Sequence, residues 1–100
     1  MQALIYEALA WLDAGNGVFR PREATREAEE QFRAVVALLA RLREKGFVDY
    51  LDRHVARGSS GIYLMVGPVQ LTEEGKGALE RDRDLGQRDP VSGDPLPWRV

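Results

Sequence analysis

The strongest constraint on the fold of this chain is the segment from Arg22 to Lys45, which contains neither glycine nor proline. Most of its residues are strong helix formers. Apolar side chains recur in it at helical spacing, thinly before residue 32 and strongly after it: Ala24, Ala28, Phe32, Val35, Val36, Leu39 and Leu42. Two structures fit this pattern. One is a single helix with Pro21 in its first turn, and the other is two helices joined by a tight turn near residues 29–31. Local chemistry favours the continuous helix.

Two more helices are predicted, one on each side of this segment. Residues 2–13 have one broad apolar face, built from Leu4, Ile5, Ala8, Leu9, Trp11 and Leu12. Gly15-Asn16-Gly17 then ends the helix, as glycine after a last turn usually does. Further along the chain, Thr72 is a good N-cap, and the two glutamates that follow it suit the first turn of a helix. This helix is predicted to extend to Leu85.

Residues 47–66 are predicted to form a β-hairpin. Residues 47–51 are β-prone, and Ile62–Val66 is apolar and rich in β-branched side chains. The tip between them, Gly58-Ser59-Ser60-Gly61, supplies the permissive backbone dihedrals that a hairpin loop needs. Arg57 stands at the base of this tip.

The composition is that of one small globular domain. The chain has 100 residues, a net charge of −2 and no cysteine, which excludes a disulfide framework and a thiol nucleophile. No apolar run approaches the roughly 18 residues that span a bilayer. The first predicted helix begins almost at Met1 and contains Glu7, so it is not a signal peptide. We therefore expect a cytoplasmic protein without membrane attachment.

The sequence predicts no enzyme activity, no metal site and no cofactor. His54 is the single histidine, and it has no partner that would make it a metal ligand or a catalytic base. The glycines of the hairpin tip lack the lysine and the following helix of a phosphate-binding loop. Paired acids such as Glu29-Glu30 and Glu73-Glu74 are explained by helix capping or by solvent exposure.

Beyond Gly86 the sequence is rich in proline and has little periodicity. Residues 86–100 are therefore predicted to be an irregular tail outside a domain of residues 1–85. We expect Leu96 or Trp98 to anchor this tail, either on its own domain or on a partner chain.

Two glycine-bearing motifs resemble parts of the winged helix-turn-helix superfamily. Leu42-Arg-Glu-Lys-Gly46-Phe-Val48 resembles the end of a recognition helix that leads into the wing. Leu71-Thr-Glu-Glu-Gly75-x-x-Ala78-Leu79 is similar to the run that follows the wing. Among small families, the chain looks most like the YjcQ-type prophage proteins. The resemblance implies an α+β winged-helix fold with three or four helices and a β-hairpin wing, and it favours a break within the 22–45 segment.

The resemblance also implies a function, that of a small bacterial or prophage DNA-binding protein acting as a transcriptional regulator. It would contact double-stranded DNA with the helix of residues 30–45 and with the wing of residues 53–61. The expected contact residues are Arg33, Ala37, Arg41, Arg53, Arg57, Ser59 and Ser60. Residues 18–61 carry a charge of +2 and the remaining residues −4, which is a faint basic footprint for nucleic acid.

Two alternatives to DNA binding stay open. The exposed helix face could be a solvated surface with ion pairs such as Glu29–Arg33 and Glu30–Arg33. Alternatively, the domain is a winged-helix protein-interaction module that does not bind DNA. A homodimer is expected, because twofold dimers are the commonest assembly and winged-helix regulators generally pair on two half-sites. The expected interface residues are Leu4, Trp11, Leu85, Leu96 and Trp98.

Overall fold

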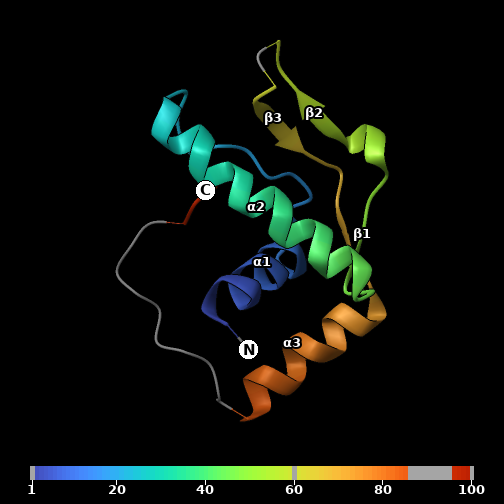
Figure 1. Cartoon of the computed structure of the whole chain (residues 1–100). Helices are drawn as coiled ribbons and strands as arrows, with labels where there is room; N and C mark the ends of the chain where they lie inside the picture. Colours follow the sequence, from blue (N-terminus) through green and yellow to red (C-terminus); the bar gives the residue numbers. More distant parts are fainter. Residues whose placement is uncertain (1, 60, 86–95, 100) are drawn as a thin grey trace.

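The computed structural model describes residues 2–59, 61–85 and 96–99, without the side chains of residues 84 and 85. Over these residues the fold is α+β, with three α-helices and two small antiparallel sheets. The elements follow one another as α1 (Ala3–Asp13), α2 (Arg26–Glu44), β1 (Val48–Asp49), a 3-10 turn (Asp52–His54), β2 (Val55–Arg57), β3 (Tyr63–Val66), β4 (Gln70–Leu71) and α3 (Glu73–Leu85). Figure 1 shows α2 crossing over α1, with α3 on one side of this pair and the β2–β3 hairpin on the other.

Helix α2 is one uninterrupted helix of 19 residues. The continuous alternative is therefore correct over Arg26–Glu44, and the break near residues 29–31 is absent. The predicted start at Pro21 is wrong, because residues 22–25 form bends and the helix begins after Thr25. The Thr25 side chain accepts a hydrogen bond from the backbone N–H of Ala28 at 3.2 Å, which makes it the N-cap.

One face of α2 is buried against the rest of the domain. Its buried residues are Ala28, Phe32, Val35, Leu39 and Leu42, which follow the helical spacing of the predicted apolar stripe. Except for Ala28, they belong to the main core, which also includes Leu9 of α1 and Leu79 of α3. The opposite face of α2 is left to solvent.

The β-hairpin is shorter than predicted and spans residues 55–66. Strand β2 pairs with β3, whereas β1 pairs with β4, so the segment of residues 47–51 does not belong to the hairpin. The cause is the 3-10 turn, which redirects the chain between the two strands. Leu51 closes this turn, since its C=O accepts from the N–H of His54 at 2.8 Å and its own N–H donates to His54 Nδ1 at 3.0 Å.

A short segment at Phe19 adds to the edge of β3. Its N–H and C=O both bond to the backbone of Val66, at 2.9 and 3.0 Å, as an isolated antiparallel bridge. Both side chains are fully buried. This bridge ties the loop after α1 to the hairpin.

The start of α3 lies tightly against the turn after α2. The Thr72 side chain accepts from the N–H of Gly75 at 3.0 Å and donates to the C=O of Gly46, so the predicted N-cap is confirmed. A Cβ at position 75 would lie 2.0 Å from the carbonyl oxygen of Phe47, so this approach requires glycine. The glycine of the second motif is thus explained by packing.

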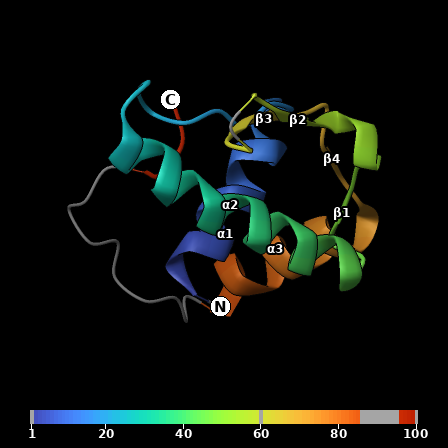
Figure 2. The ribbon, with the colours of Figure 1, turned by 45° about the horizontal axis from the view of Figure 1, so that its top comes forward.

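The C-terminal residues complete the core of their own chain. Trp98 is fully buried, edge-on to Phe19 with ring centroids 5.2 Å apart, and its ring centroid lies 6.5 Å from that of Trp11. Leu96 packs against the same core. The sequence left open whether the tail is anchored on its own domain or on a partner chain. In the structure, Leu96 and Trp98 anchor it on its own domain. Figures 1 and 2 both show the C-terminus beside the N-terminal part of α2 and the loop that precedes it.

Candidate nucleic-acid interface

The helix residues expected to contact DNA lie on the solvent face of α2. Arg33, Ala37 and Arg41 are spaced by four residues, so they follow one stripe of the helix, and all three are exposed. Ala34 is exposed as well. Small side chains between two arginines leave the helix backbone open to close approach.

Three of the wing residues expected to contact DNA, Arg53, Arg57 and Ser59, are exposed but differ in their surroundings. Arg57 ends β2, and its guanidinium lies over the ring of Tyr63, 5.1 Å from the ring centroid. Its Nη2 also reaches the Tyr63 hydroxyl at 3.5 Å. Arg53 lies in the 3-10 turn, and Ser59 lies at the hairpin tip. Ser60 lies outside the described residues.

Two separate hollows lie between α2 and the segments around the hairpin, and the two together are called the groove below. The larger, of about 410 Å³, is lined by Val36, Ala40, Arg43, Tyr50, Asp52, Val55, Arg57 and Tyr63. The smaller, of about 250 Å³, is lined by Arg26, Glu29, Glu30, Arg33 and Ile62. Arg33 of α2 lines the smaller hollow and Arg57 of the hairpin lines the larger, so the two residues lie at different hollows. Arg41 and Arg53 line neither hollow. Figure 2 shows the hairpin alongside α2 in this region.

Arg43 is a groove residue that the sequence analysis missed. Its Nη1 lies 2.8 Å from Asp52 Oδ1, and its guanidinium lies over the ring of Tyr50, 4.8 Å from the centroid. The hydrogen bond to Asp52 raises the pKa of Arg43, although partial desolvation opposes this change. Val36, Ala40 and Arg43 follow one another at helical spacing, so the sequence did contain a signal for this second stripe.

Tyr50 lies beneath Arg43 and is buried. Burial raises the pKa of its hydroxyl, because the phenolate would be poorly solvated, while the charge of Arg43 acts in the opposite direction. On the side of the groove next to β1, the uncharged ring of Tyr50 therefore lies beneath the guanidinium of Arg43, and the carboxylate of Asp52 holds that guanidinium in place.

The ion pairs expected around Arg33 are not those found. Glu30 pairs with Arg26, at 3.5 Å from Arg26 Nε, rather than with Arg33. Both side chains of that pair are largely exposed, so its effect on stability is small. The guanidinium of Arg33 has no ion pair within the described part of the chain, although Glu29 and Glu30 line the same hollow.

The described residues contain no group of three histidine or acidic side chains that could hold a metal ion. None of the helices described is long and apolar enough to cross a membrane. Comparison with protein-family models, with curated proteins and with solved structures found no significant match to this chain.

The homodimer stays a prediction. Among the expected interface residues, Leu96 and Trp98 pack in the core of their own chain, and Trp98 has no exposed surface with which to reach a partner. Leu4 and Trp11 are half-buried on α1. The side chain of Leu85 lies outside the described residues.

Proposed function

We propose that this protein is a winged-helix DNA-binding protein whose wing is the β2–β3 hairpin. The order of elements supports the assignment: a first helix, a short bridged segment, a long helix, a hairpin and a final helix. The bridge between Phe19 and Val66 adds a third strand-like segment beside the hairpin, as expected for a wing that is anchored to the body of the domain.

The observation that carries the proposal is that exposed Arg33 and Arg57 each line one of the two hollows between α2 and the hairpin. One comes from the exposed face of α2 and the other from the hairpin. A helix inserted in the major groove and a wing beside it would place these guanidinium groups on phosphates or on guanine edges. Arg41, two turns after Arg33, would extend the contact along the helix.

Protein interaction is the second candidate, and the unbroken α2 favours it. The superfamily has a turn before its recognition helix, whereas α2 continues from Arg26 to Glu44 without one. Glu29 and Glu30 lie beside Arg33 and would repel phosphates. A module of this kind would use the same groove for a peptide or for a neighbouring domain.

Fluorescence anisotropy with a labelled random-sequence duplex at low salt decides between the two. If Arg33, Arg41, Arg53 and Arg57 all reach phosphates, the slope of log K against log salt is about −3 to −4. Arg57→Ala should weaken binding to all sequences and reduce the magnitude of the slope by about 1. Arg81→Ala is the matched control, because Arg81 is an exposed arginine on α3, away from the groove. Absence of binding at low salt would reject DNA binding and favour the interaction module.

A further inference from the structure

The larger hollow of the groove, of about 410 Å³, contains two arginines that each lie over a tyrosine. The Arg43 guanidinium lies 4.8 Å from the ring centroid of Tyr50. The Arg57 guanidinium lies 5.1 Å from the ring centroid of Tyr63. All four residues line this hollow, although they come from α2, the segment after β1 and the two strands of the hairpin. Tertiary structure therefore gathers two arginine–tyrosine stacks at one place.

Hydrogen bonds help to hold both guanidinium planes in place. Arg43 Nη1 donates to Asp52 Oδ1 at 2.8 Å. Arg57 Nη2 donates to the Tyr63 hydroxyl at 3.5 Å. Arg57 is exposed and Arg43 is partly exposed, whereas Tyr50 beneath Arg43 is buried. Because a guanidinium is planar and delocalised, the outer faces of these two groups are surfaces on which a flat ring of a ligand can stack.

The remaining lining of this hollow includes apolar side chains. Val36 and Ala40 belong to α2, and Val55 belongs to β2. The volume of the hollow lies within the range of about 300–1,000 Å³ that is usual for sites that enclose a small organic group. The hollow thus combines apolar contacts with planar cations, a combination that suits a heteroaromatic ring.

The charges of the hollow favour such a ring over a cluster of phosphates. Because Arg43 donates to the carboxylate of Asp52, its charge is largely neutralised. Among the described residues that line the hollow, Arg57 is then the cation left to attract an anion.

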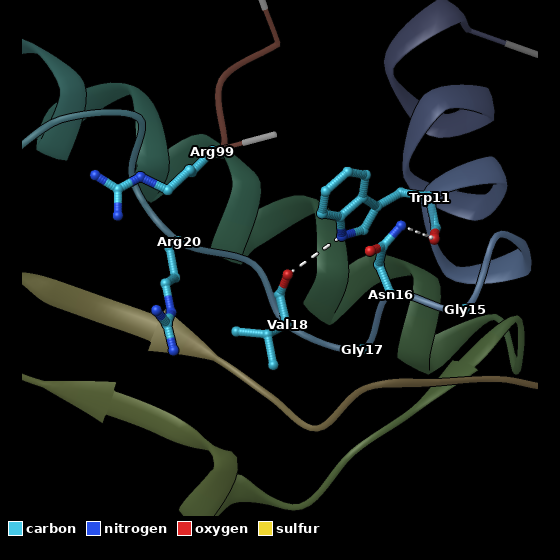
Figure 3. A pocket seen from close by; sticks show the side chains of 7 residues that line it. All are labelled: Trp11, Gly15, Asn16, Gly17, Val18, Arg20 and Arg99. Atoms are coloured by element: carbon cyan, nitrogen blue, oxygen red, sulfur yellow. Dashed lines mark hydrogen bonds between the residues drawn. The ribbon is translucent and has the colours of Figure 1, made fainter.

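A hollow at the end of α1 also has arginines near an aromatic ring, but it is arranged differently. Trp11, Arg20 and Arg99 are among its described lining residues. Figure 3 shows the guanidinium groups of Arg20 and Arg99 pointing away from each other and from the Trp11 ring. Arginines and an aromatic ring in one hollow are therefore not sufficient for a stacked surface, which the larger hollow of the groove has.

We infer that the larger hollow of the groove binds an unpaired nucleobase, so that the protein prefers a DNA end with a single-stranded overhang to a blunt duplex. Unpaired bases stack on aromatic side chains and on arginine guanidinium planes. A base inside a duplex cannot present its faces in this way, because its neighbours in the helix cover both of them. Arg57 would also attract the phosphate next to the bound base. This preference rests on the proposed DNA binding by the groove and specifies the kind of DNA bound.

Fluorescence anisotropy with three labelled DNAs that share one duplex tests this preference. One is blunt, one carries an overhang of three thymidines, and one carries an overhang of three abasic nucleotides, which has the added phosphates without the bases. The thymidine overhang should lower the Kd at least about fivefold relative to the abasic overhang, because each stacked base adds to the free energy of binding. Equal Kd values for the two overhangs would overturn the inference and leave duplex binding intact. Absence of binding to all three DNAs would reject the proposed function as well.

Arg57→Lys separates the planar guanidinium from its charge. Lysine keeps the positive charge but has no plane on which a base can stack. The variant should therefore weaken binding of the thymidine overhang at least about threefold more than binding of the blunt duplex. Arg81→Lys is the matched control, because Arg81 is exposed on α3, away from the groove, and the overhang preference should stay unchanged. A wild-type preference in Arg57→Lys would contradict the proposed stacking.

Tyr63→Leu and Tyr63→Phe test the ring beneath Arg57. Leucine removes the aromatic support of the guanidinium, so most of the overhang preference should be lost, whereas phenylalanine keeps the ring and should retain most of it. Thermal unfolding followed by circular dichroism checks that each variant folds. Should Tyr63→Leu fail to fold, Arg57→Lys decides alone, because Arg57 is exposed and its replacement leaves the core unchanged. An undiminished preference in folded Tyr63→Leu would place the base elsewhere and overturn the inference.

Discussion

Two arginine-bearing surfaces of this protein differ in what holds their guanidinium groups. In the groove between α2 and the hairpin, Arg43 is hydrogen-bonded to Asp52, and Arg57 lies over the ring of Tyr63. At the hollow lined by Trp11, Arg20 and Arg99, the two arginines have no side-chain partner among the described residues, although Glu23 and Glu29 line a neighbouring hollow with them. The two surfaces have similar residue types, but the second offers its charges more freely.

This difference teaches that the number of arginines on a surface is a poor guide to what the surface binds. A guanidinium that already donates to a carboxylate has fewer donors for a ligand, and its charge is largely neutralised. Arginines spread along a groove and mixed with acids suit an extended partner with many weak contacts.

The largest expected effect is the loss of stability when the buried side chain of Trp98 is removed. Trp98→Ala should lower the free energy of unfolding by about 3–5 kcal/mol, since a large ring is removed from a closely packed core. Because Trp98 packs against Trp11 and Phe19, the surface around Trp11 and Arg99 should be disrupted with it. Urea denaturation measures the change in stability.

Trp98→Phe is the matched control for this prediction. It keeps an aromatic ring and removes a buried indole N–H that has no hydrogen-bond partner within the described residues. Most of the stability should therefore remain. A Trp98→Ala variant as stable as the wild type would show that the tail does not belong to the core in solution.

The second prediction is that only one of the two surfaces binds duplex DNA. The double variant Arg33→Ala, Arg57→Ala should weaken duplex binding several-fold, whereas Arg99→Gln should leave it unchanged. Fluorescence anisotropy with a labelled duplex measures both variants. Equal losses of affinity in the two variants would show that the arginines between α2 and the hairpin have no special part in DNA binding.

The third prediction is that duplex binding becomes stronger when Arg43 is freed from its ion pair with Asp52. Asp52→Asn removes the charge that holds Arg43, so duplex affinity at low salt should rise about twofold to threefold. Asp49→Asn is the control, because Asp49 is a nearby exposed acid without a described ion pair. Equal gains in the two variants would indicate a general charge effect rather than release of Arg43.

The smallest expected effect is on the pH dependence of stability, and it concerns Tyr50, whose ring lies beneath Arg43. Burial raises the pKa of Tyr50 above its usual value near 10, so the folded state holds this proton more tightly than the unfolded state. The resulting stability is present at neutral pH and is lost as the pH rises from about 10 through the folded-state pKa. Tyr50→Phe should unfold with a shallower pH dependence above pH 10, as measured by urea denaturation. A wild-type slope in this variant would contradict the assignment.

Local signals in the sequence predicted the helices well. Gly15 ends α1 with a positive φ of 98°, and Thr72 caps α3 as expected. The continuity of α2 also followed from local chemistry, because no residue between Arg26 and Glu44 favours a turn. The resemblance to the winged helix-turn-helix superfamily favoured a break there and was misleading on this point. Thr25, a good N-cap three residues before Ala28, was the overlooked signal for the start of α2.

The structure brings together only part of the DNA-contact site that the sequence predicted. Arg33 and Arg57 line two different hollows between α2 and the hairpin, while Arg41 and Arg53 line neither of them. Arg43 was missed because its partner Asp52 lies beyond the end of the helix. Spacing within one element predicts which residues share a face, but it does not predict which neighbouring element supplies their partners.

The sequence by itself determined where the helices end and which face of each is buried, because capping, glycine and apolar spacing act within a few residues. Tertiary structure alone decided that β1 pairs with β4, that Trp98 enters the core, and that the backbone of Arg99 bonds to that of Arg20. These contacts join residues far apart in the chain. They depend on how the helices and strands pack and on which backbone groups remain unpaired after packing. Local sequence patterns do not contain this information.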